Sequence, residues 1–181
     1  MWSSVAVLLL IQAALSYGEW ISVANGGRWG NWGDVQRCPP DSRAVGFNLK
    51  VEESQRKGDD TALNGIGLFC AYPNGSPAGM ITSSVSQWGR WGNGLWCQKH
   101  LAAFRLQVEP SQSKGDDTAA NNMEMLCSDP KHLIGIGGHW GTYGSWSPSC
   151  YTGICAIKTK VEAPQGRGDD TALNDVQFEC C

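Results

Sequence analysis

Apolar and polar residues alternate along three pairs of short segments of this chain. In the first pair, Phe47, Leu49 and Val51 alternate with small or polar residues, and so do Ile66 and Leu68. A period of two residues is typical of a β-strand that buries one face. The residues expected to face inward are Val45, Phe47, Leu49, Val51, Ile66 and Leu68; Ala102, Phe104, Leu106, Val108, Met123 and Met125; and Cys155, Ile157, Thr159, Val161, Val176 and Phe178. No window has the period of a long amphipathic helix, so the pattern predicts an all-β protein.

These strands belong to a unit that occurs three times. Each copy opens with tryptophans among glycines, passes a cysteine, and gives a strand that ends in Val-Glu. A polar loop with the sequence GDDTA follows, at Gly58, Gly115 and Gly168, and each copy closes on a strand that ends in cysteine. Self-similarity at a period of this length indicates repeated structural units that bury their apolar faces against one another. We therefore expect three sheets around a pseudo-threefold axis.

Composition and charge exclude several classes of protein. The 23 glycines and 9 tryptophans of the 181 residues favour turn-rich β structure with large aromatic anchors. The net charge of −3 provides neither the basic surface that nucleic acid requires nor a polybasic segment for a membrane surface. We expect no nucleic-acid partner and no membrane association.

The N-terminus predicts a secretory signal peptide. The apolar run VAVLLLIQAALS is too short to span a bilayer and ends in small residues at Ala14 and Ser16. We place the cleavage after Ser16. Residues 1–16 are then a signal peptide, residues 17–181 form a single three-repeat domain, and the protein is secreted.

The cysteines predict a disulfide framework. An even number behind a signal peptide is typical of disulfides, and the eight are Cys38, Cys70, Cys97, Cys127, Cys150, Cys155, Cys180 and Cys181. Equivalence between repeats pairs Cys38 with Cys70 and Cys97 with Cys127. The three histidines do not lie at zinc-ligand spacing, so we expect no metal and no cofactor.

The third repeat leaves two pairings open. Equivalence between repeats favours Cys150 with Cys180, which leaves Cys155 for Cys181. Alternation along the strands favours Cys155 with Cys180, because both are expected to point inward, and then Cys150 with Cys181. The sequence does not decide between them.

Several of these motifs resemble the vitelline membrane outer layer protein I family. They are the tryptophan turns, GFNLKVE, GDDTALNGI, and GDDTALND followed by the terminal Cys-Cys, and the resemblance runs from Trp20 to Cys181. It implies a β-prism of three Greek-key sheets with pseudo-threefold symmetry. It also implies a secreted, disulfide-bonded component of an egg coat or a mucosal secretion. Since related prism folds occur in lectins, it implies glycans or extracellular glycoproteins as partners.

Aromatic residues in the glycine-rich turns are the candidates for carbohydrate binding. Tryptophan and tyrosine rings stack on sugar faces and bury a large area at low entropic cost. The candidates are Trp29, Trp32, Trp88, Trp91, Trp140, Tyr143 and Trp146. The alternative interpretation is that they close the ends of the prism, because they recur in all copies. Tyr143 stands where the other copies have Trp32 and Trp91, so three identical sites are not expected.

The acids of the GDDTA elements are the alternative site, represented by Asp60, Asp117 and Asp170. A glycosidase needs two carboxylates that flank the scissile bond, whereas adjacent residues of an extended chain point to opposite faces. We interpret the element as a turn in which an aspartate accepts backbone hydrogen bonds. No nucleophile motif is present, so we expect a protein that is not an enzyme. The alternative is a weak carbohydrate-acting enzyme, of oligosaccharide transferase or lysozyme-like character, that uses these acids.

Two short motifs remain. RGD at Arg167–Asp169 reads KGD in the other two copies, so we interpret it as a variation of the repeat and not as an adhesion signal. Asn74 begins an Asn-Gly-Ser sequon in a loop that we expect to be exposed, followed by Pro77, which disfavours its use. Asn74 is a candidate glycosylation site.

Overall fold

The computed structural model describes residues 18–53, 62–110, 120–163 and 172–181, and there it forms three antiparallel sheets. Sheet B contains β4 (Arg43–Val51), β5 (Leu63–Ala71), β6 (Pro77–Thr82), β7 (Arg90–Trp91) and β8 (Leu95–Trp96). Sheet C contains β9 (Leu101–Val108), β10 (Ala120–Cys127), β11 (His132–Ile134) and β12 (Thr142–Tyr143). Sheet A contains β13 (Ile154–Val161), β14 (Leu173–Cys180), β1 (Trp20–Ile21), β2 (Asn31–Trp32) and β3 (Gln36–Arg37). The predicted all-β fold is confirmed.

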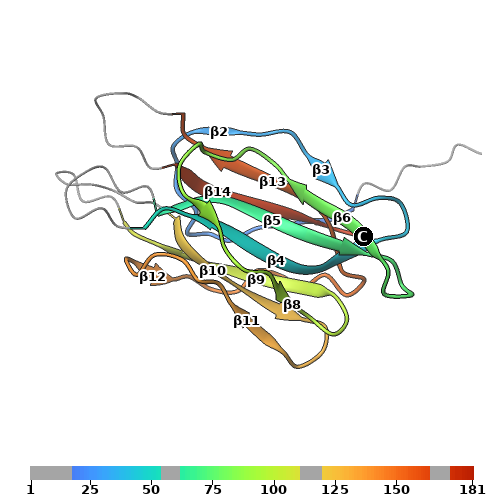
Figure 1. Cartoon of the computed structure of the whole chain (residues 1–181). Coiled ribbons are helices and arrows are strands. Elements are labelled where there is room, and N and C mark those ends of the chain that lie inside the picture. Colours follow the sequence, from blue (N-terminus) through green and yellow to red (C-terminus); the bar gives the residue numbers. More distant parts are fainter. Residues whose placement is uncertain (1–17, 54–61, 111–119, 164–171) are drawn as a thin grey trace, which may run out of the picture.

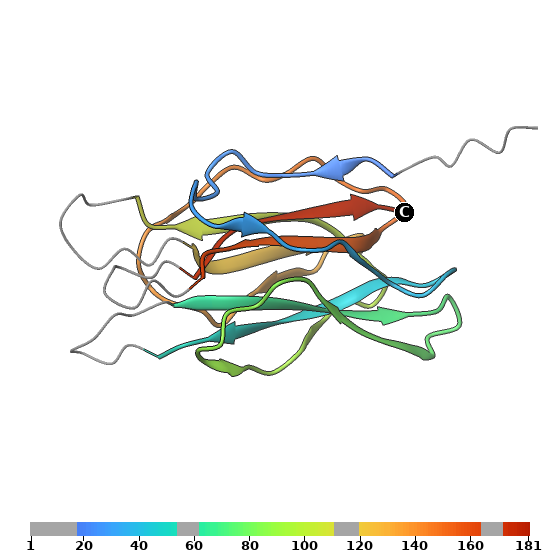
Figure 2. The same cartoon turned by 90° about the horizontal axis from the view of Figure 1, so that it is seen from above.

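Each sheet is a Greek key. In sheet B the order is β6-β5-β4-β7, so three consecutive strands are followed by one that returns beside the first. Sheet C repeats this order as β11-β10-β9-β12. Figures 1 and 2 show that the long strands of all three sheets run along roughly one direction, as the walls of a prism. The described part of the chain holds no helix long and apolar enough to cross a membrane.

The repeat seen in the sequence and the sheet seen in the structure are not the same unit. The tryptophan turn of the second copy supplies β7 and β8 to sheet B, whose long strands come from the first copy. Likewise, the turn of the third copy supplies β12 to sheet C. The turn of the first copy supplies β2 and β3 to sheet A, beside β13 from the third copy. Each copy therefore completes its predecessor's wall, and the first completes the last.

The inner faces of the sheets form one core. Phe47, Phe104 and Phe178 are fully buried, one from each sheet, and the rings of Phe104 and Phe178 meet edge to face with centroids 4.8 Å apart. Thr159, also fully buried, donates its hydroxyl to the carbonyl of Ser84 at 2.6 Å, so this polar group is paired inside the prism. From Phe47, Phe104 and Ile157 to the ends of their strands, the residues predicted to face inward are buried in this core or partly buried.

One prediction about the inward faces is wrong. Val45, Ala102 and Cys155 were expected to point inward, yet they are only half-buried, and the residues before them lie in the core instead. Those core residues are Ala44, Leu101 and Ile154. The register shifts at the same point of all three sheets, which is a β-bulge that reverses the alternation. The alternation along one strand does not reveal a bulge, because a bulge is an extra residue relative to the partner strand.

A second bulge lies at the other end of each closing strand. The bulged residues are asparagines, Asn64, Asn121 and Asn174, and all three are fully buried. The amides of Asn64 and Asn174 donate to the carbonyls of Ala62 and Ala172, whose φ angles of 47° and 48° are left-handed. The recurrent asparagine thus holds a tight local turn at the start of the strand.

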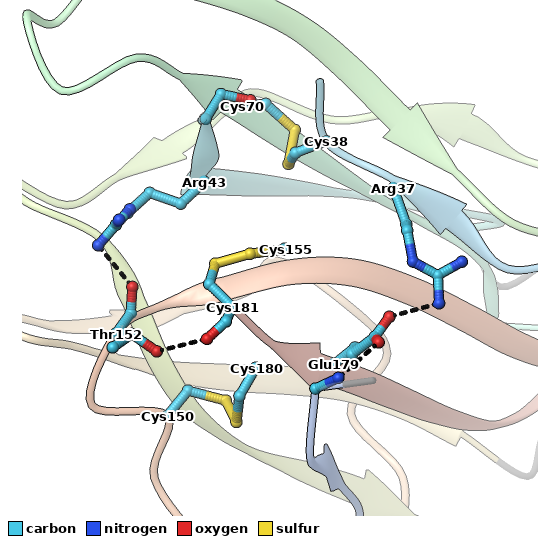
Figure 3. The surroundings of a disulfide bond; sticks show 12 residues. Arg37, Cys38, Arg43, Cys70, Cys150, Thr152, Cys155, Glu179, Cys180 and Cys181 are labelled. Atoms are coloured by element: carbon cyan, nitrogen blue, oxygen red, sulfur yellow. Dashed lines mark hydrogen bonds and ion pairs between the residues drawn. A yellow bond between two sulfur atoms is a disulfide. The ribbon is translucent and has the colours of Figure 1, made fainter. Parts of the chain in front are cut away.

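The disulfides join the three walls into a covalent ring. Cys38 continues the β3 edge of sheet A and bonds Cys70 of sheet B. Cys97 continues sheet B and bonds Cys127 of sheet C, while Cys150 follows sheet C and bonds Cys180 of sheet A. These bonds lie at one end of the prism, which we call the disulfide end. Figure 3 shows two of them there, Cys38–Cys70 and Cys150–Cys180, close to Cys181.

The open question of the third repeat is thereby answered. The bonds are Cys150–Cys180 and Cys155–Cys181, as equivalence between repeats favoured. The pairing favoured by alternation is wrong because Cys155 is the bulged residue and does not point inward. Cys155–Cys181 lies within sheet A, so it is the bond that has no counterpart in the other walls.

Asp175 is a half-buried acid at a position that another repeat fills with an amide. Burial raises the pKa of Asp175 to about 6, opposed by a hydrogen bond from the backbone N–H of Val176 and by the charge of Lys160. In sheet C, Asn122 accepts the equivalent bond from Met123 and donates to the carbonyl of Gly135. The amide makes these contacts without the cost of burying a charge.

Replacing Asp175 with asparagine is therefore expected to stabilise the protein at neutral pH. A carboxyl with a raised folded-state pKa destabilises the fold once it ionises, so wild-type stability should fall between about pH 4 and pH 6. At pH 7.5 the variant should gain about 1–2 kcal/mol, after allowing for solvent screening of a half-buried group. Urea unfolding at pH 7.5 and pH 4 measures this; an equal gain at both pH values would contradict the assignment.

Candidate functional site

The end of the prism opposite the disulfides carries three equivalent Trp-Gly turns, and we call it the tryptophan end. The glycines Gly30, Gly89 and Gly141 have φ angles of 80°, 77° and 79°, in the left-handed region. A Cβ there would clash with the backbone of the valine that ends β13, β4 or β9. This close approach projects the preceding tryptophans outward: Trp29, Trp88 and Trp140 are 54%, 44% and 61% exposed.

The second aromatic of each turn lies on the outer face of a wall. Trp32 pairs with Lys160 of β13, Trp91 with Lys50 of β4, and Tyr143 with Gln107 of β9. The three residues are equivalent, yet their surroundings differ between walls. Some of these aromatic rings contact a cation of the protein itself, and others line a pocket.

On sheet A, a cation lies between two aromatic rings. The ammonium of Lys158 is 4.6 Å from the ring centroid of Trp20 and 5.1 Å from that of Trp32. Cation–π contacts of this kind contribute about 0.5–1 kcal/mol at exposed sites. The role of Trp20, which lies outside the repeated motif, could not be inferred from the sequence because its partner Lys158 is far along the chain.

On sheet C a cation also lies beside two aromatic rings, and here it is part of an ion-pair network. The guanidinium of Arg105 is 4.7 Å from the ring of Tyr143 and 4.8 Å from that of Trp146. Arg105 also pairs with the buried Glu124 at 2.6 Å, and the imidazole of His132 lies 2.8 Å from the same carboxylate. Burial, then the charge and hydrogen bond of Glu124, raise the pKa of Tyr143 to about 12. Tyr143 and Trp146 thus hold an internal ion-pair network.

On sheet B, Asn48 takes the place of the cation. It lies opposite Gly67, as Arg105 lies opposite Glu124 and Lys158 opposite Gln177. The ring of Trp96, another tryptophan outside the strict repeat, stacks on Phe69 with centroids 4.4 Å apart. Trp91 therefore has no cation from its own wall at the equivalent position, and it remains 38% exposed.

Trp91 and Trp140 line one pocket of about 610 Å³ at the tryptophan end, between sheets B and C. Sheet B and its loops contribute Glu52, Glu53, Arg90 and Asn93 as polar groups, and the segment before β12 contributes Ile136 and His139. A mostly apolar concave surface with a few polar groups is the usual form of a small-ligand site. Two of the seven aromatic residues predicted from the sequence are brought together here.

The other predicted residues fall into four groups. Trp29 and Trp88 are exposed at equivalent turns, whereas Trp32, Tyr143 and Trp146 lie beside cations on the outer walls. Asp60, Asp117 and Asp170, like the predicted signal peptide, lie outside the described residues. Asn74 lies in an exposed turn, where its side-chain oxygen accepts bonds from the N–H and the hydroxyl of Ser76.

Potential metal ligands gather at one place in the described segments. They are Cys97, Cys127 and Asp129. Because Cys97 and Cys127 are joined to each other, neither sulfur is available as a thiolate. The cluster therefore offers a single carboxylate, which is too few ligands for a zinc or calcium site.

Comparison with known proteins places the whole described chain in one group. The family model for vitelline membrane outer layer protein I matches residues 19–181. The vitelline membrane outer layer protein 1 homologs of human and mouse are 47% and 46% identical over 169 residues, which cover 91% of this chain and 84% of each relative.

Solved structures of plant lectins share the fold. An artocarpin–mannopentose complex superposes with a TM-score of 0.57 at 13% identity, covering 91% of this chain and 97% of the lectin. The mannose-binding lectin from Champedak gives a TM-score of 0.57 at 12% identity, covering 92% and 99%. At such identities the likeness establishes the β-prism architecture and nothing about ligands.

Proposed function

The chain belongs to the vitelline membrane outer layer protein I family, and from this premise we propose that it is a secreted structural protein that binds glycan chains. It would serve in an extracellular coat, such as the outer layer of the egg vitelline membrane, or in a mucosal secretion. The pocket between Trp91 and Trp140 is the observation that carries the glycan-binding proposal.

An extracellular location agrees with the covalent structure. All eight cysteines form disulfides, three of which link the walls in a ring. Such bonds form and persist in oxidising compartments and are reduced in the cytosol. A closed, cross-linked prism resists unfolding, which suits a component of a durable coat.

The pocket has the composition that a sugar requires. Aromatic faces such as those of Trp91 and Trp140 pack against the C–H face of a pyranose, and polar groups such as Asn93 and Glu52 reach its hydroxyls. Glu52 and Glu53 outnumber Arg90 among the charged groups of the lining, so the pocket favours a neutral sugar over an anionic one. Affinity for one short saccharide should be weak, about millimolar to tens of micromolar.

A polymer is expected to bind better than a short saccharide. Trp29 and Trp88 project from turns equivalent to that of Trp140, at the same end of the prism. A long chain that contacts more than one of these turns gains effective concentration without any new kind of contact.

Replacing Trp91 or Trp140 with alanine is expected to weaken binding of a long neutral polymer such as chitin about tenfold. Each change removes one aromatic face of the pocket, and tenfold corresponds to about 1.4 kcal/mol. Titrations followed by tryptophan fluorescence measure the binding, and circular dichroism verifies folding.

The matched control is Trp29→Ala. Trp29 occupies the equivalent turn of another copy and is similarly exposed, but does not line this pocket. The control should lose clearly less affinity than the pocket variants. If all three variants bind every polymer as the wild type does, or if no polymer binds at all, the glycan proposal fails and a purely structural role remains.

A carbohydrate-acting enzyme is the second candidate, because the pocket contains carboxylates, Glu52 and Glu53, although they do not form the pair that known glycosidases use. Glu52 and Glu53 are adjacent in the chain, whereas hydrolysis needs an acid and a base or nucleophile on two sides of the bond. Oligosaccharide turnover that is lost in both Glu52→Gln and Glu53→Gln would support the enzyme. Turnover that is absent from the wild type would exclude it for the substrates tested.

A further inference from the structure

Two basic residues from different sheets meet near the pseudo-threefold axis at the disulfide end. Arg43, His100 and Gly153 occupy equivalent positions, each directly before the first core residue of its sheet. A Cβ on Gly153 would lie 3.1 Å from the His100 ring and 3.2 Å from the Arg43 side chain, and the φ of Gly153 is 100°. Glycine in the third copy therefore leaves space for the basic side chains of the other two.

Arg43 and His100 line a pocket of about 460 Å³ that the proposed glycan site does not include. Arg43, Val45 and Ala71 lie at the ends of β4 and β5 farthest from the tryptophan end. Gln98, Lys99, Tyr72 and Pro73 also line it. Asn74, the sequon residue, follows Pro73 directly, so the pocket lies beside that turn.

The charge in this pocket is positive although the protein as a whole is acidic. Burial lowers the pKa of His100, and the charges of Arg43 and Lys99 lower it further. A hydrogen bond with the backbone of Tyr151 and the charge of Asp129 act in the opposite direction. The lining itself contains Arg43 and Lys99 but no acidic side chain.

Hydrogen bonds through Thr152 hold the guanidinium of Arg43 in place. Arg43 donates to the backbone carbonyl of Thr152 at 2.6 Å, and the hydroxyl of Thr152 donates to an oxygen of Cys181 at 2.9 Å (Figure 3). Thr152 therefore links the guanidinium of Arg43 to the backbone of Cys181. The hydrogen bond to Thr152 fixes one nitrogen of the Arg43 guanidinium and so orients its other N–H groups. The side chain of Lys99 is exposed to solvent.

We propose that this pocket binds a saccharide that carries an anionic group, a carboxylate or a sulfate ester, on Arg43 and Lys99. The fork of an arginine matches the oxygens of either group, and a lysine adds a point charge. A volume of about 460 Å³ is far larger than a bare anion needs and falls within the range of small-ligand sites. The partly exposed ring of Tyr72 supplies a face for the sugar ring.

The test uses the full chain with Asn74→Gln, so that no N-glycan covers the rim. Sialyllactose supplies the carboxylate and a sulfated galactose the sulfate ester, with lactose and inorganic sulfate as the matched neutral and bare-anion probes. Calorimetry measures affinity, and the ring signals of His100 in NMR report the site, assigned with His100→Gln. At least one anionic saccharide should bind ten times more tightly than lactose and should raise the pKa of His100, because a nearby negative charge favours the imidazolium.

Lys99→Gln should weaken that binding at least fivefold, and Arg28→Gln is its control, since Arg28 is exposed at the other end of the prism. Trp91→Ala and Trp140→Ala should leave it unchanged, which separates this site from the glycan pocket. Equal affinity for lactose in the Trp91→Ala variant, whose other pocket is impaired, or unchanged affinity for the anionic saccharide in Lys99→Gln, overturns the proposal. An inorganic sulfate response equal to that of the saccharides overturns the saccharide as ligand.

Discussion

Removing the Cys150–Cys180 bond by alanine substitution at both positions is expected to lower the free energy of unfolding by about 3–4 kcal/mol. The two cysteines are 30 residues apart, and closing a loop of this length removes that much conformational entropy from the unfolded chain. The bond also joins sheet C to sheet A, so its loss opens the covalent ring. Denaturant unfolding under non-reducing conditions measures the change.

Cys155–Cys181 is the matched control for this prediction. Its cysteines are 26 residues apart, so the entropic contribution should be nearly the same, but it lies within sheet A and Cys181 is exposed. Cys150, by contrast, is fully buried, so its replacement also removes core packing. We expect the control to cost about 1 kcal/mol less. A Cys150–Cys180 variant that loses under 1 kcal/mol would show that the ring contributes little to stability.

Replacing Phe104 with alanine is expected to cost about 3–5 kcal/mol. Phe104 is fully buried where the three sheets meet, and its ring contacts that of Phe178 edge to face. Truncation loses the burial of the ring and leaves a cavity that the surrounding sheets, cross-linked to one another, cannot easily fill. The edge-to-face contact adds about 0.5–1.5 kcal/mol to the loss. Thermal and urea unfolding measure it.

The protein itself provides the control substitution. Ile157 occupies the position in sheet A that Phe104 occupies in sheet C, so isoleucine is compatible with this backbone. Phe104→Ile keeps most of the buried apolar volume and should cost clearly less than Phe104→Ala. Equal losses in both variants would indicate that the aromatic contact, and not the filled volume, determines stability at this position.

The sequence alone determined the six long strands and their threefold repetition. Alternation at residues such as Phe47, Leu49 and Val51 depends only on which face of a strand is buried, and each strand carries that information in its own side chains. The equivalence of the copies also fixed two disulfides, Cys38–Cys70 and Cys97–Cys127. The aromatic residues of the turns were recognised as candidates because their kind and their glycine neighbours are local features.

The tertiary structure alone decided the bulges, the exchange of edge strands and the composition of each pocket. A bulge at Cys155 depends on the partner strand, so the alternation of its own strand gave the wrong face. Trp91 and Trp140 line one pocket because each turn completes the wall of another copy, whereas the equivalent Trp32 lies beside Lys158. The same residue type at equivalent positions therefore has different surroundings, because these are set by residues distant in the chain.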